Sequence, residues 1–531
     1  MSSALPLAKA TAQSVLALTL VFSICFPLPL EKAHALDGRS APAESNTGSS
    51  YVDNDATGND ADASPQLGGS ASSALSHAAE SGNPIVDWIA CGTCRWMIDA
   101  RGCLTIAPME GADSGELSYW KDAPWYDYRD SITSAKIKDG VVAATTFRMF
   151  RDCSRLISVD LSGLDTSKVT EMGREDTWES GMFSGCTRLA YLDVSSLDTS
   201  NVTSMGCMFE DCSSLTSLDL STFDTSNVVD MNSMFAGCTK LTSLDLSGFD
   251  TSMAKSMDYM FYDCSSLKSV SLSQKFSFTG RGITRLCKLP KPLEKKGYTG
   301  LWVSSTDGMT YAPDEIPNYV AATYTAQIAF PDVDYSDWYG DAISFVSAKG
   351  LITGYTDGEK AGFFGVGDTL TRAQFATILW RNACPDEYAA YDPKTAVDTT
   401  GIEGSADGMY YTAAANWAVA NGYITGIDNL DGTFDFAADK PVSFEQMITI
   451  LARIAATPDE VAASRGDLSA FVDGDMASSW SRNPLAWAHD LGLVEGYNDP
   501  DRGKLLCPGE NVERQRAATV LARAFTMGVL K

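Results

Sequence analysis

Repetition in the middle of the chain constrains its fold more than any other feature of the sequence. A unit of 26 residues recurs there, and one cysteine position marks its period: Cys186, Cys212, Cys238 and Cys264. Cys153 stands 33 residues before the first of these, which leaves a seven-residue insertion around Glu175 to Gly181. Segments with a period of about 20 to 50 residues stack so that neighbours bury a shared core. The period predicts a solenoid over residues 146–278, with the cysteines as a buried column.

Each unit contains the LxxLxL strand of a leucine-rich repeat, as at Leu215, Leu218 and Leu220. Because side chains alternate along a strand, Leu218 faces the core and Asp219 faces outward. The opposite arm, Met231 to Cys238, has the spacing of a short helical turn. The outward positions predict an exposed stripe, formed by Ser217, Asp219, Ser221, Asp160, Asp193 and Asp245. Two interpretations stay open, a solvated face that opposes aggregation and a recognition surface for a glycan or host protein.

The repeat resembles that of the BspA-like leucine-rich-repeat surface proteins of bacteria, whose unit reads DLSxFDTSNVxxMxxMFxxC. The resemblance runs over about residues 86–310 and includes CRWMIDARGCLTI at Cys94 and YTGLWV at Tyr298. It implies a role in adhesion or host interaction, but members differ in ligand, so no binding residue carries over. Around the solenoid we expect a β-rich N-terminal cap at 86–145 and a small β module or linker at 279–326.

A second period follows, set by GLITGY at Gly350, GYITGI at Gly422 and GLVEGY at Gly492. An aromatic residue precedes each glycine by 12 residues, at Trp338, Tyr410 and Trp480. Each unit is predicted to begin with an amphipathic helix, the first with Trp338, Ala342, Ile343 and Val346 on one face. Each is predicted to end with a second helix, which in the first unit opens with a capping box of Thr371 and Gln374.

These units resemble the S-layer homology (SLH) repeat, through FPDV at Phe330, the Gly-Tyr pairs and LTRAQ at Leu370. The resemblance implies an all-α-dominated, three-pronged domain that binds a secondary cell-wall polysaccharide carrying ketal-linked pyruvate. The three repeats are expected at residues 327–385, 394–456 and 467–527. Together the two resemblances give a multidomain fold class, an α/β leucine-rich-repeat solenoid followed by the helical SLH domain.

Arg372 is the candidate ligand for the wall polymer, because it opens a helix whose first amides and dipole favour an anion and its guanidinium suits a carboxylate. Arg514 holds the equivalent place in the third unit, where Glu513 replaces the capping Thr371 and adds a competing charge. Phe444 occupies it in the second unit. We expect the first site to be intact, the third weakened and the second without its anion clamp. Thr371, beside Arg372, is also a candidate residue for binding the polymer. The family resemblance adds further groove residues, which are Gly354, Tyr355, Gly496 and Tyr497.

The N-terminus predicts export. Lys9 gives a basic start, residues 14–29 an apolar stretch, and Ala33-His34-Ala35 a cleavage site, so residues 1–35 read as a signal peptide. Residues 36–85 are rich in Ser, Gly, Ala and Asp and read as a disordered linker. No later segment predicts a membrane span, so we expect noncovalent attachment at the cell wall. The formal net charge of −28 argues against nucleic acid and anionic membranes as partners.

The cysteines and histidines give no sign of catalysis. Cys91, Cys94 and Cys103 lie in alternating sequence typical of a hairpin, with room for one disulfide, and a redox pair is the alternative. His77 and His489 are not placed to activate a repeat cysteine, and HExxH, GxSxG and Walker motifs are missing from the sequence. We expect no enzyme activity, no catalytic residue, no metal and no cofactor. Calcium held by Asp428, Asp431 or the stacked aspartates of the repeats is the alternative to solvated loop acids.

The sequence therefore predicts an extracellular, wall-anchored protein that displays a repeat domain for adhesion. Two other interpretations stay open: a structural envelope or S-layer component without a dedicated ligand, and an SLH-anchored hydrolase of cell-wall glycans.

Overall fold

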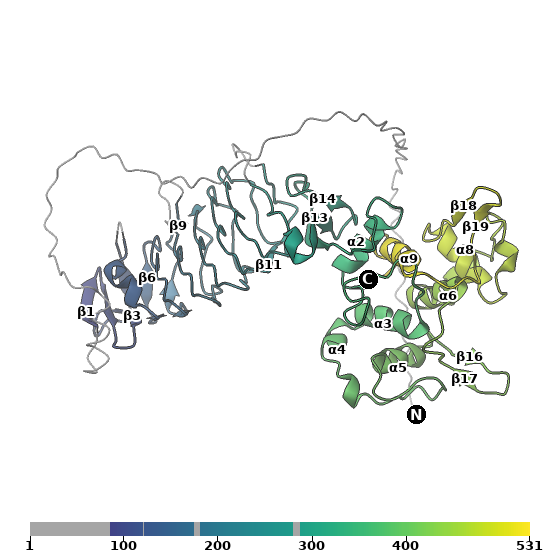
Figure 1. Cartoon of the computed structure of the whole chain (residues 1–531). Coiled ribbons are helices and arrows are strands. Elements are labelled where there is room, and N and C mark those ends of the chain that lie inside the picture. The colour runs from purple at the N-terminus through teal and green to yellow at the C-terminus, as the bar shows by residue number, and fades with distance from the viewer. Residues whose placement is uncertain (1–84, 120–121, 175–180, 280–286, 531) are drawn as a thin grey trace, which may run out of the picture. The chain divides into compact units, whose positions relative to one another are not determined.

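The computed structural model describes residues 85–119, 122–174, 181–279 and 287–530 (Figure 1). The predicted signal peptide, the predicted linker up to residue 84 and most of the insertion at 175–181 lie outside the described residues. The chain is multidomain, with a sheet-rich N-terminal part and short helices in its C-terminal part. Among the residues described, none of the helices is both long enough and apolar enough to cross a membrane.

The N-terminal part is built on a sheet that passes directly into the repeats. Its strand order is β1-β2-β3-β5-β7, antiparallel from β1 to β3 and parallel from β3 to β7. A smaller sheet, β4-β6-β8, is parallel. The elements are β1 (Val86–Cys91), β2 (Cys94–Ile98), β3 (Cys103–Pro108), β4 (Gly115–Leu117), the 3₁₀ helix η1 (Tyr126–Ser131), β5 (Ser134–Ile137), β6 (Val141–Ala143), β7 (Ser158–Asp160) and β8 (Leu164–Asp165). Because β5 pairs with β7 of the first repeat, backbone hydrogen bonds continue across this boundary.

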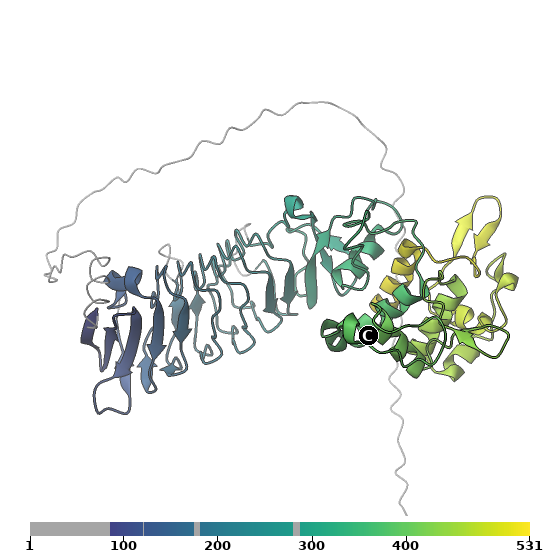
Figure 2. The same cartoon turned by 60° about the horizontal axis from the view of Figure 1, so that its bottom comes forward.

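The 26-residue units form turns that stack in parallel register (Figure 2). Equivalent backbone groups pair between successive turns, as where the Phe209 amide donates to the Met234 carbonyl at 3.0 Å and the Phe235 amide to the Met260 carbonyl at 3.0 Å. The strands that this produces are short: β9 (Glu171–Gly173), β10 (Ser204–Met205), β11 (Ser243–Leu246) and β12 (Ser269–Leu272). Side chains at one position in each turn are therefore brought into columns.

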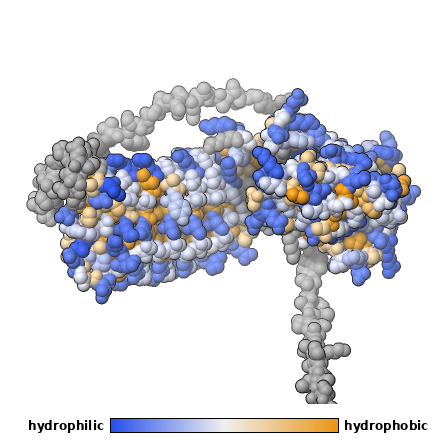
Figure 3. All heavy atoms as spheres, turned by 90° about the horizontal axis from the view of Figure 1, so that it is seen from below, coloured by the Kyte–Doolittle hydropathy of each residue, from blue (hydrophilic) through white to orange (hydrophobic). Residues whose placement is uncertain are grey.

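Two such columns form the centre of the repeat core. One is a stack of buried phenylalanine rings with centroids 5.4 to 6.1 Å apart, from residues Phe150, Phe183, Phe209, Phe235 and Phe261. The other is the cysteine column, also buried. On the face seen in Figure 3, hydrophobic side chains reach the surface in the middle of the repeat region, with hydrophilic ones on both sides.

The arm from Met231 to Cys238 is not helical, and here the sequence prediction was wrong. It consists of turns, in which the Cys238 amide donates to the Phe235 carbonyl at 3.1 Å, and Ser233 has a positive φ of 52°. Amides in this arm donate to the next turn instead, the Gly237 amide to the Tyr262 carbonyl at 2.8 Å. Pairing between turns has replaced the helical i to i−4 bonds.

A mixed sheet continues from the last turns, with strand order β11-β12-β15-β13-β14, in which β11 and β12 are parallel and the other pairs are antiparallel. Its remaining elements are η2 (Glu294–Lys296), β13 (Tyr298–Ser304), β14 (Thr310–Tyr311) and β15 (Ala322–Ile328). Since β15 pairs with β12, it covers the strand edge that another repeat would otherwise occupy.

The C-terminal part is a ring of three similar units. In each, an early helix packs on a late helix of another unit: α5 on α3, α8 on α6 and α2 on α9. Its elements are α2 (Gly340–Ala348), α3 (Arg372–Ala383), α4 (Pro385–Ala389), η3 (Pro393–Thr395), α5 (Thr412–Ala420), β16 (Ile427–Asp428), β17 (Phe434–Asp435), α6 (Phe444–Ala455), α7 (Pro458–Ala463), η4 (Gly474–Met476), α8 (Arg482–Asp490), β18 (Tyr497–Asp499), β19 (Gly503–Leu505) and α9 (Arg514–Thr526).

Backbone hydrogen bonds close this ring. The Leu370 amide donates to the Val512 carbonyl, the Val512 amide to the Val442 carbonyl and the Val442 amide to the Leu370 carbonyl, each at 2.9 Å. All three side chains are buried. Each unit thus supplies one donor and one acceptor to a closed cycle, and the arrangement has approximate threefold symmetry.

One element of the first unit differs from its sequence prediction. Ile343 and Val346 are buried in α2, but Trp338 precedes the helix and is 63% exposed. The neighbouring Tyr339 is the aromatic residue that enters the core. Tyr410 and Trp480 are exposed in the same way, so this aromatic position faces outward in all three units.

Candidate functional site

Three surface grooves lie between the units of the C-terminal ring, and each draws residues from all three. In every groove, the first residue of a long helix, the loop with the Gly-Tyr or Gly-Ile pair and the exposed aromatic residue come from three different units. We name the grooves by that helical residue. The Arg514 groove contains Gly354, Tyr355 and Tyr410, the Arg372 groove contains Gly426, Ile427 and Trp480, and the Phe444 groove contains Gly496, Tyr497 and Trp338. Their volumes are about 690, 410 and 580 Å³.

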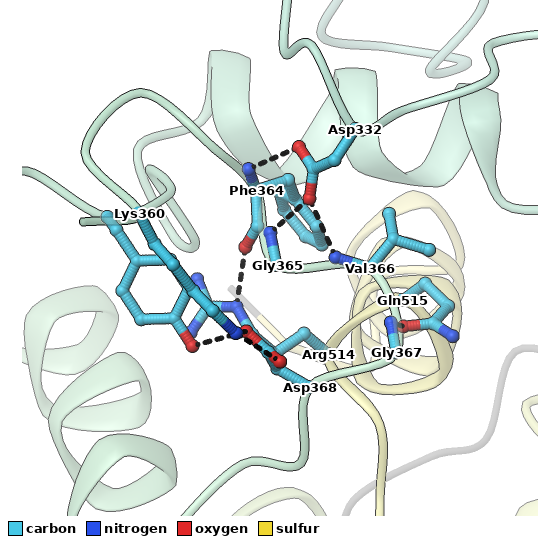
Figure 4. A network of polar contacts seen from close by, with 10 residues as sticks. Asp332, Lys360, Phe364, Gly365, Val366, Gly367, Asp368, Arg514 and Gln515 are labelled. Atoms are coloured by element: carbon cyan, nitrogen blue, oxygen red, sulfur yellow. Dashed lines mark hydrogen bonds and ion pairs between the residues drawn. The ribbon is translucent and has the colours of Figure 1, made fainter.

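Arg514 is held against the first unit although it belongs to the third. Its Nε donates to the Phe364 carbonyl at 2.7 Å, and its guanidinium lies 4.6 Å from the centre of the Tyr355 ring. The Tyr355 hydroxyl in turn donates to Asp368 at 3.0 Å, and Lys360 forms an ion pair with the same carboxylate at 2.6 Å. Figure 4 shows Arg514, Lys360 and Asp368 converging beside Phe364. These contacts therefore fix the orientation of the guanidinium. None of them is an ion pair between Arg514 and a carboxylate.

The loop that receives Arg514 is itself organised by one carboxylate. Asp332 accepts hydrogen bonds from the amides of Phe364, Gly365 and Val366 at 2.6 to 2.9 Å (Figure 4). These three bonds orient the Phe364 carbonyl toward Arg514. Asp473 plays the same part in the third unit, where it accepts from the amides of Leu506 and Cys507, both at 2.7 Å. Asp332 is the aspartate of the FPDV motif, so these hydrogen bonds explain the structural role of that residue in the motif.

Arg372 is bound in the second groove by the equivalent contacts. Its Nε donates to the Phe436 carbonyl at 2.8 Å and its guanidinium lies 6.0 Å from the Phe436 ring centre. A weaker contact at 3.4 Å joins it to Gln446. The groove also contains Arg453, whose guanidinium donates to the Tyr423 carbonyl at 3.0 Å. The described lining residues of this groove include two arginines and no carboxylate.

Arg372 and Arg514 are both 5% exposed, which is unusual for a charged residue. Within residues 85–119, 122–174, 181–279 and 287–530, neither forms an ion pair with a carboxylate. Burial lowers the pKa of both side chains. Asp435 opposes the shift at Arg372, and Tyr355, Asp368 and Asp332 oppose it at Arg514. Arginine nevertheless stays charged in proteins. A buried, unpaired cation at the wall of a groove favours an anion from outside the chain.

The helix amides do not add to this anion site, contrary to the sequence prediction. The Arg372 amide donates to the Lys440 carbonyl at 2.9 Å and the Ala373 amide to the Ala438 carbonyl at 3.1 Å. The Gln374 amide donates to the Thr371 hydroxyl in the capping box, as predicted, and Gln374 accepts from the Thr371 amide. Thr371 therefore has a capping role, and the positive charge of the groove comes from the side chains of Arg372 and Arg453. Neighbouring units use up these amides, because their chains cross in the ring.

Two predicted relationships between units also change. Tyr355 and Gly354 come together with Arg514, whereas Gly496 and Tyr497 lie in the Phe444 groove, away from both Arg372 and Arg514. Glu513, predicted to compete with Arg514, lines the Phe444 groove instead. Arg514, whose anion site Glu513 was expected to weaken, therefore lines a different groove from Glu513. Sequence register within one unit could not show this, because every groove joins different units.

The Phe444 groove has a different composition. Arg516 lies with its guanidinium 3.6 Å from the Phe444 ring centre and donates to the Leu506 carbonyl at 2.6 Å. Arg523 forms an ion pair with Glu495 at 2.9 Å. Glu510 and Glu513 line the same groove, so it contains three carboxylates and two guanidinium groups.

A second arginine in each groove was missed from the sequence. Arg381, Arg453 and Arg523 stand at one register in α3, α6 and α9 and each contacts a carbonyl of the Gly-Tyr loop region, that of Gly350, Tyr423 or Leu493. Each follows the helix-opening residue by nine positions. That recurring spacing was the available signal.

In the repeat region, the aspartates of the predicted stripe stabilise their own turns. Asp193 and Asp219 are exposed, and each accepts from the amide of the serine two residues later, Ser195 at 3.0 Å and Ser221 at 2.9 Å. Asp245 accepts from Ser247 and Asp160 from Ser162 in the same way. Ser217 is exposed beside them. These contacts lower the pKa of Asp160, Asp193 and Asp219 through the serine hydrogen bonds, so the carboxylates have a local structural role.

The cysteines of the N-terminal sheet are placed as the hairpin predicts. Cys91 and Cys94 face each other across β1 and β2, and Cys103 begins β3. All are free thiols. In the part of the chain that is described, no group of three or more His, Cys, Asp or Glu side chains could hold a metal ion. Asp428 and Asp431 instead accept amide hydrogen bonds within their loop.

Comparisons with known proteins give a family match in each half of the chain. A family described as a Mycoplasma protein of unknown function, DUF285, matches residues 144–275. The S-layer homology domain matches residues 329–376. The chain thus contains an S-layer homology domain in the first unit of the C-terminal ring.

Two individual proteins are also similar to parts of the chain. An amylopullulanase from Thermoanaerobacterium thermosulfurigenes is 24% identical over 227 residues, which are 42% of this chain and 11% of that enzyme. A crystal structure of a leucine-rich repeat protein from Eubacterium ventriosum has 15% identity and a TM-score of 0.12, and the match covers 34% of this chain and 83% of that one.

Proposed function

We propose that the chain is a cell-surface protein held to the bacterial wall by three S-layer homology units, at 327–385, 394–456 and 467–527. The observation that carries this is the threefold ring, in which the second and third units repeat the contacts of the unit matched by the domain family. The ring presents two buried guanidinium groups to grooves. The ligand is an anionic wall polysaccharide, and a pyruvate ketal supplies the carboxylate.

The Arg372 groove is the stronger of the two proposed anion sites. Arg372 and Arg453 give it a net charge of +2, whereas the Arg514 groove contains Asp357 beside Arg514 and Arg381. A carboxylate can receive two parallel hydrogen bonds from the planar guanidinium of Arg372, whose Nε already fixes its plane. Trp480 stands exposed at the same groove, where a sugar ring attached to the acid can pack against it.

Retention on purified wall sacculi tests the anchor. Arg372→Ala is expected to weaken retention of the full-length mature protein at least about tenfold, because a charge-assisted contact is lost in a desolvated site. Arg514→Ala is expected to have a smaller effect. Arg502→Ala, which removes an exposed guanidinium paired with Asp499 in the same ring, is the matched control. Undiminished retention of Arg372→Ala would show that Arg372 does not bind the polymer. Equal binding of the wild-type protein to native and depyruvylated polymer would show that the pyruvate is not its ligand.

For the repeat region we propose a BspA-like leucine-rich-repeat solenoid that is displayed for adhesion to a glycan or host protein. The exposed row of Asp193, Asp219 and Asp245 supports this as a regular acidic surface. On a glycan and host-protein array, Asp193→Lys with Asp219→Lys is expected to lose a specific signal that the unchanged protein gives. A structural envelope component would give no specific signal with either protein.

We further propose that the chain binds without catalysis. The repeat thiols are buried, and burial raises the pKa of Cys212 and Cys264 to about 12, which makes them poor nucleophiles. The similarity to an amylopullulanase favours a hydrolase as the second candidate, but its 11% coverage of that enzyme is the extent of a module rather than of the whole. Zymography of the full-length protein on peptidoglycan and on α-glucan is expected to show no clearing, and a cleared zone would establish the hydrolase.

A further inference from the structure

The Phe444 groove has the same plan as the other two but the opposite sign of charge. All three have an exposed aromatic residue, a Gly-containing loop and the first turn of a long helix. In the Phe444 groove the charges come from Glu495, Glu510 and Glu513 against Arg516 and Arg523, a net charge of −1. The Arg372 groove has +2 and the Arg514 groove +1 from the same kinds of position.

The two cations of this groove are already engaged. Arg523 pairs with Glu495 at 2.9 Å. The Arg516 guanidinium lies 3.6 Å from the Phe444 ring centre, within the range of a cation–π contact, and it donates to the Leu506 carbonyl. Glu510 and Glu513 remain exposed at the groove. An incoming carboxylate would meet the negative charges of these two side chains there, which opposes its binding.

The remaining surface of the groove suits a sugar that has no acid group. Trp338 is 63% exposed and Tyr497 is 43% exposed, so both rings offer apolar faces to a ligand. Glutamate oxygens at the rim accept hydrogen bonds from hydroxyl, amide or amino groups. The volume of about 580 Å³ accommodates one or two sugar rings.

We propose that the Phe444 groove binds an uncharged or amino-bearing sugar residue of the wall polysaccharide, stacked on Trp338, while the Arg372 and Arg514 grooves bind its acidic residues. The proposal rests on the proposed function, because it assigns a third subsite for the same polymer. The C-terminal ring of three units would then bind two kinds of sugar residue along the glycan, and only two of its grooves would need the acid.

The test measures binding of the full-length protein to immobilised pyruvylated wall polysaccharide before and after mild-acid removal of the pyruvate. Wild type is expected to bind the depyruvylated polymer weakly but saturably. Trp338→Ala should reduce that binding about fivefold, whereas Arg372→Ala with Arg514→Ala should leave it unchanged. Tyr191→Ala is the matched control, because it removes an exposed ring that lines none of the three grooves and should leave binding to both polymers unchanged.

A second variant reverses the sign of the groove. Glu510→Gln with Glu513→Gln changes its net charge from −1 to +1. In the Arg372→Ala, Arg514→Ala background, this change should raise binding to the native polymer above the weak level that the Phe444 groove alone provides, without raising binding to the depyruvylated polymer. Binding of native but not depyruvylated polymer by wild type, or equal binding of the depyruvylated polymer by wild type and Trp338→Ala, would overturn the third subsite and leave the anchor intact. Failure of wild type to bind native polymer would instead overturn the proposed function.

Discussion

Buried polar side chains mark both halves of this chain, and their neighbours decide what each can do. The thiols of the repeat column donate to phenylalanine carbonyls of the preceding turn, as Cys212 does to Phe183 at 3.3 Å and Cys238 to Phe209 at 3.2 Å. A neutral thiol can be satisfied this way, because it needs a single weak acceptor. The guanidinium groups of Arg372 and Arg514 cannot be neutralised by carbonyl groups. The first kind of residue therefore completes a core, whereas the second kind is proposed to bind an anion.

The cysteine column predicts a loss of stability in alkaline solution. Burial raises the pKa of Cys212 from 9.0 to about 12, so above pH 9 the unfolded chain releases a proton that the folded chain keeps. The contribution of this thiol is fully present below pH 9 and is lost as pH rises toward 12. The free energy of unfolding should fall by about 1.4 kcal/mol per pH unit for each such thiol.

Denaturant unfolding of wild type and Cys212→Ala across this range would measure the effect. The variant will start less stable, but its dependence on pH should be shallower by the contribution of one thiol. The slope is the informative quantity, because lysine and tyrosine titration is common to both proteins. Parallel pH profiles for the two proteins would contradict a buried, protonated Cys212.

At the scale of single elements, capping chemistry distinguishes otherwise similar helices. α3 and α6 both open with complete capping boxes, Thr371 with Gln374 and Ser443 with Gln446. α9 has Glu513 at the same place and no side-chain cap hydrogen bond. Thr371→Ala is expected to lower the free energy of unfolding by about 1 kcal/mol, whereas Glu513→Thr should raise it by several tenths.

Urea unfolding followed by circular dichroism would compare these two variants under the same conditions. Their opposite signs separate a capping effect from a general response to substitution at a unit boundary. Destabilisation by both would mean that the interactions of Glu513 with its neighbour Gln515 matter more than the missing cap.

Local chemistry of this kind explains what could be predicted from the sequence. The capping box of Thr371 and Gln374 involves residues three apart, and the repeat period follows from equally spaced cysteines. Arg514, in contrast, contacts the carbonyl of Phe364, 150 residues away. Whether it would meet its own loop or that of the first unit depends on how the ring closes, which no spacing within one unit encodes. The helical arm of the repeat was mispredicted for the same reason, since pairing between turns overrides local periodicity.

For the whole molecule, closure of the ring means that no groove belongs to one unit. Deleting residues 467–531 removes the Val512 carbonyl, which accepts from Leu370, and takes α9 away from α2 and α8 away from α6. It also removes Trp480 from the groove of Arg372, although Arg372 and Gly426 remain.

The truncated protein is therefore expected to lose much more of its retention on sacculi than the one third that independent units would predict. It is also expected to unfold at a lower temperature. Hydrogen exchange should show the Leu370 amide unprotected, while the Val442 amide, whose acceptor at Leu370 is still present, keeps part of its protection. Val512→Ala is the comparator, because it shortens a buried side chain at a cost of about 1 to 3 kcal/mol but preserves the backbone cycle and all three grooves. If the truncated protein bound the polymer as well as Val512→Ala does, the units would act as independent modules and the closed ring would not be needed for binding.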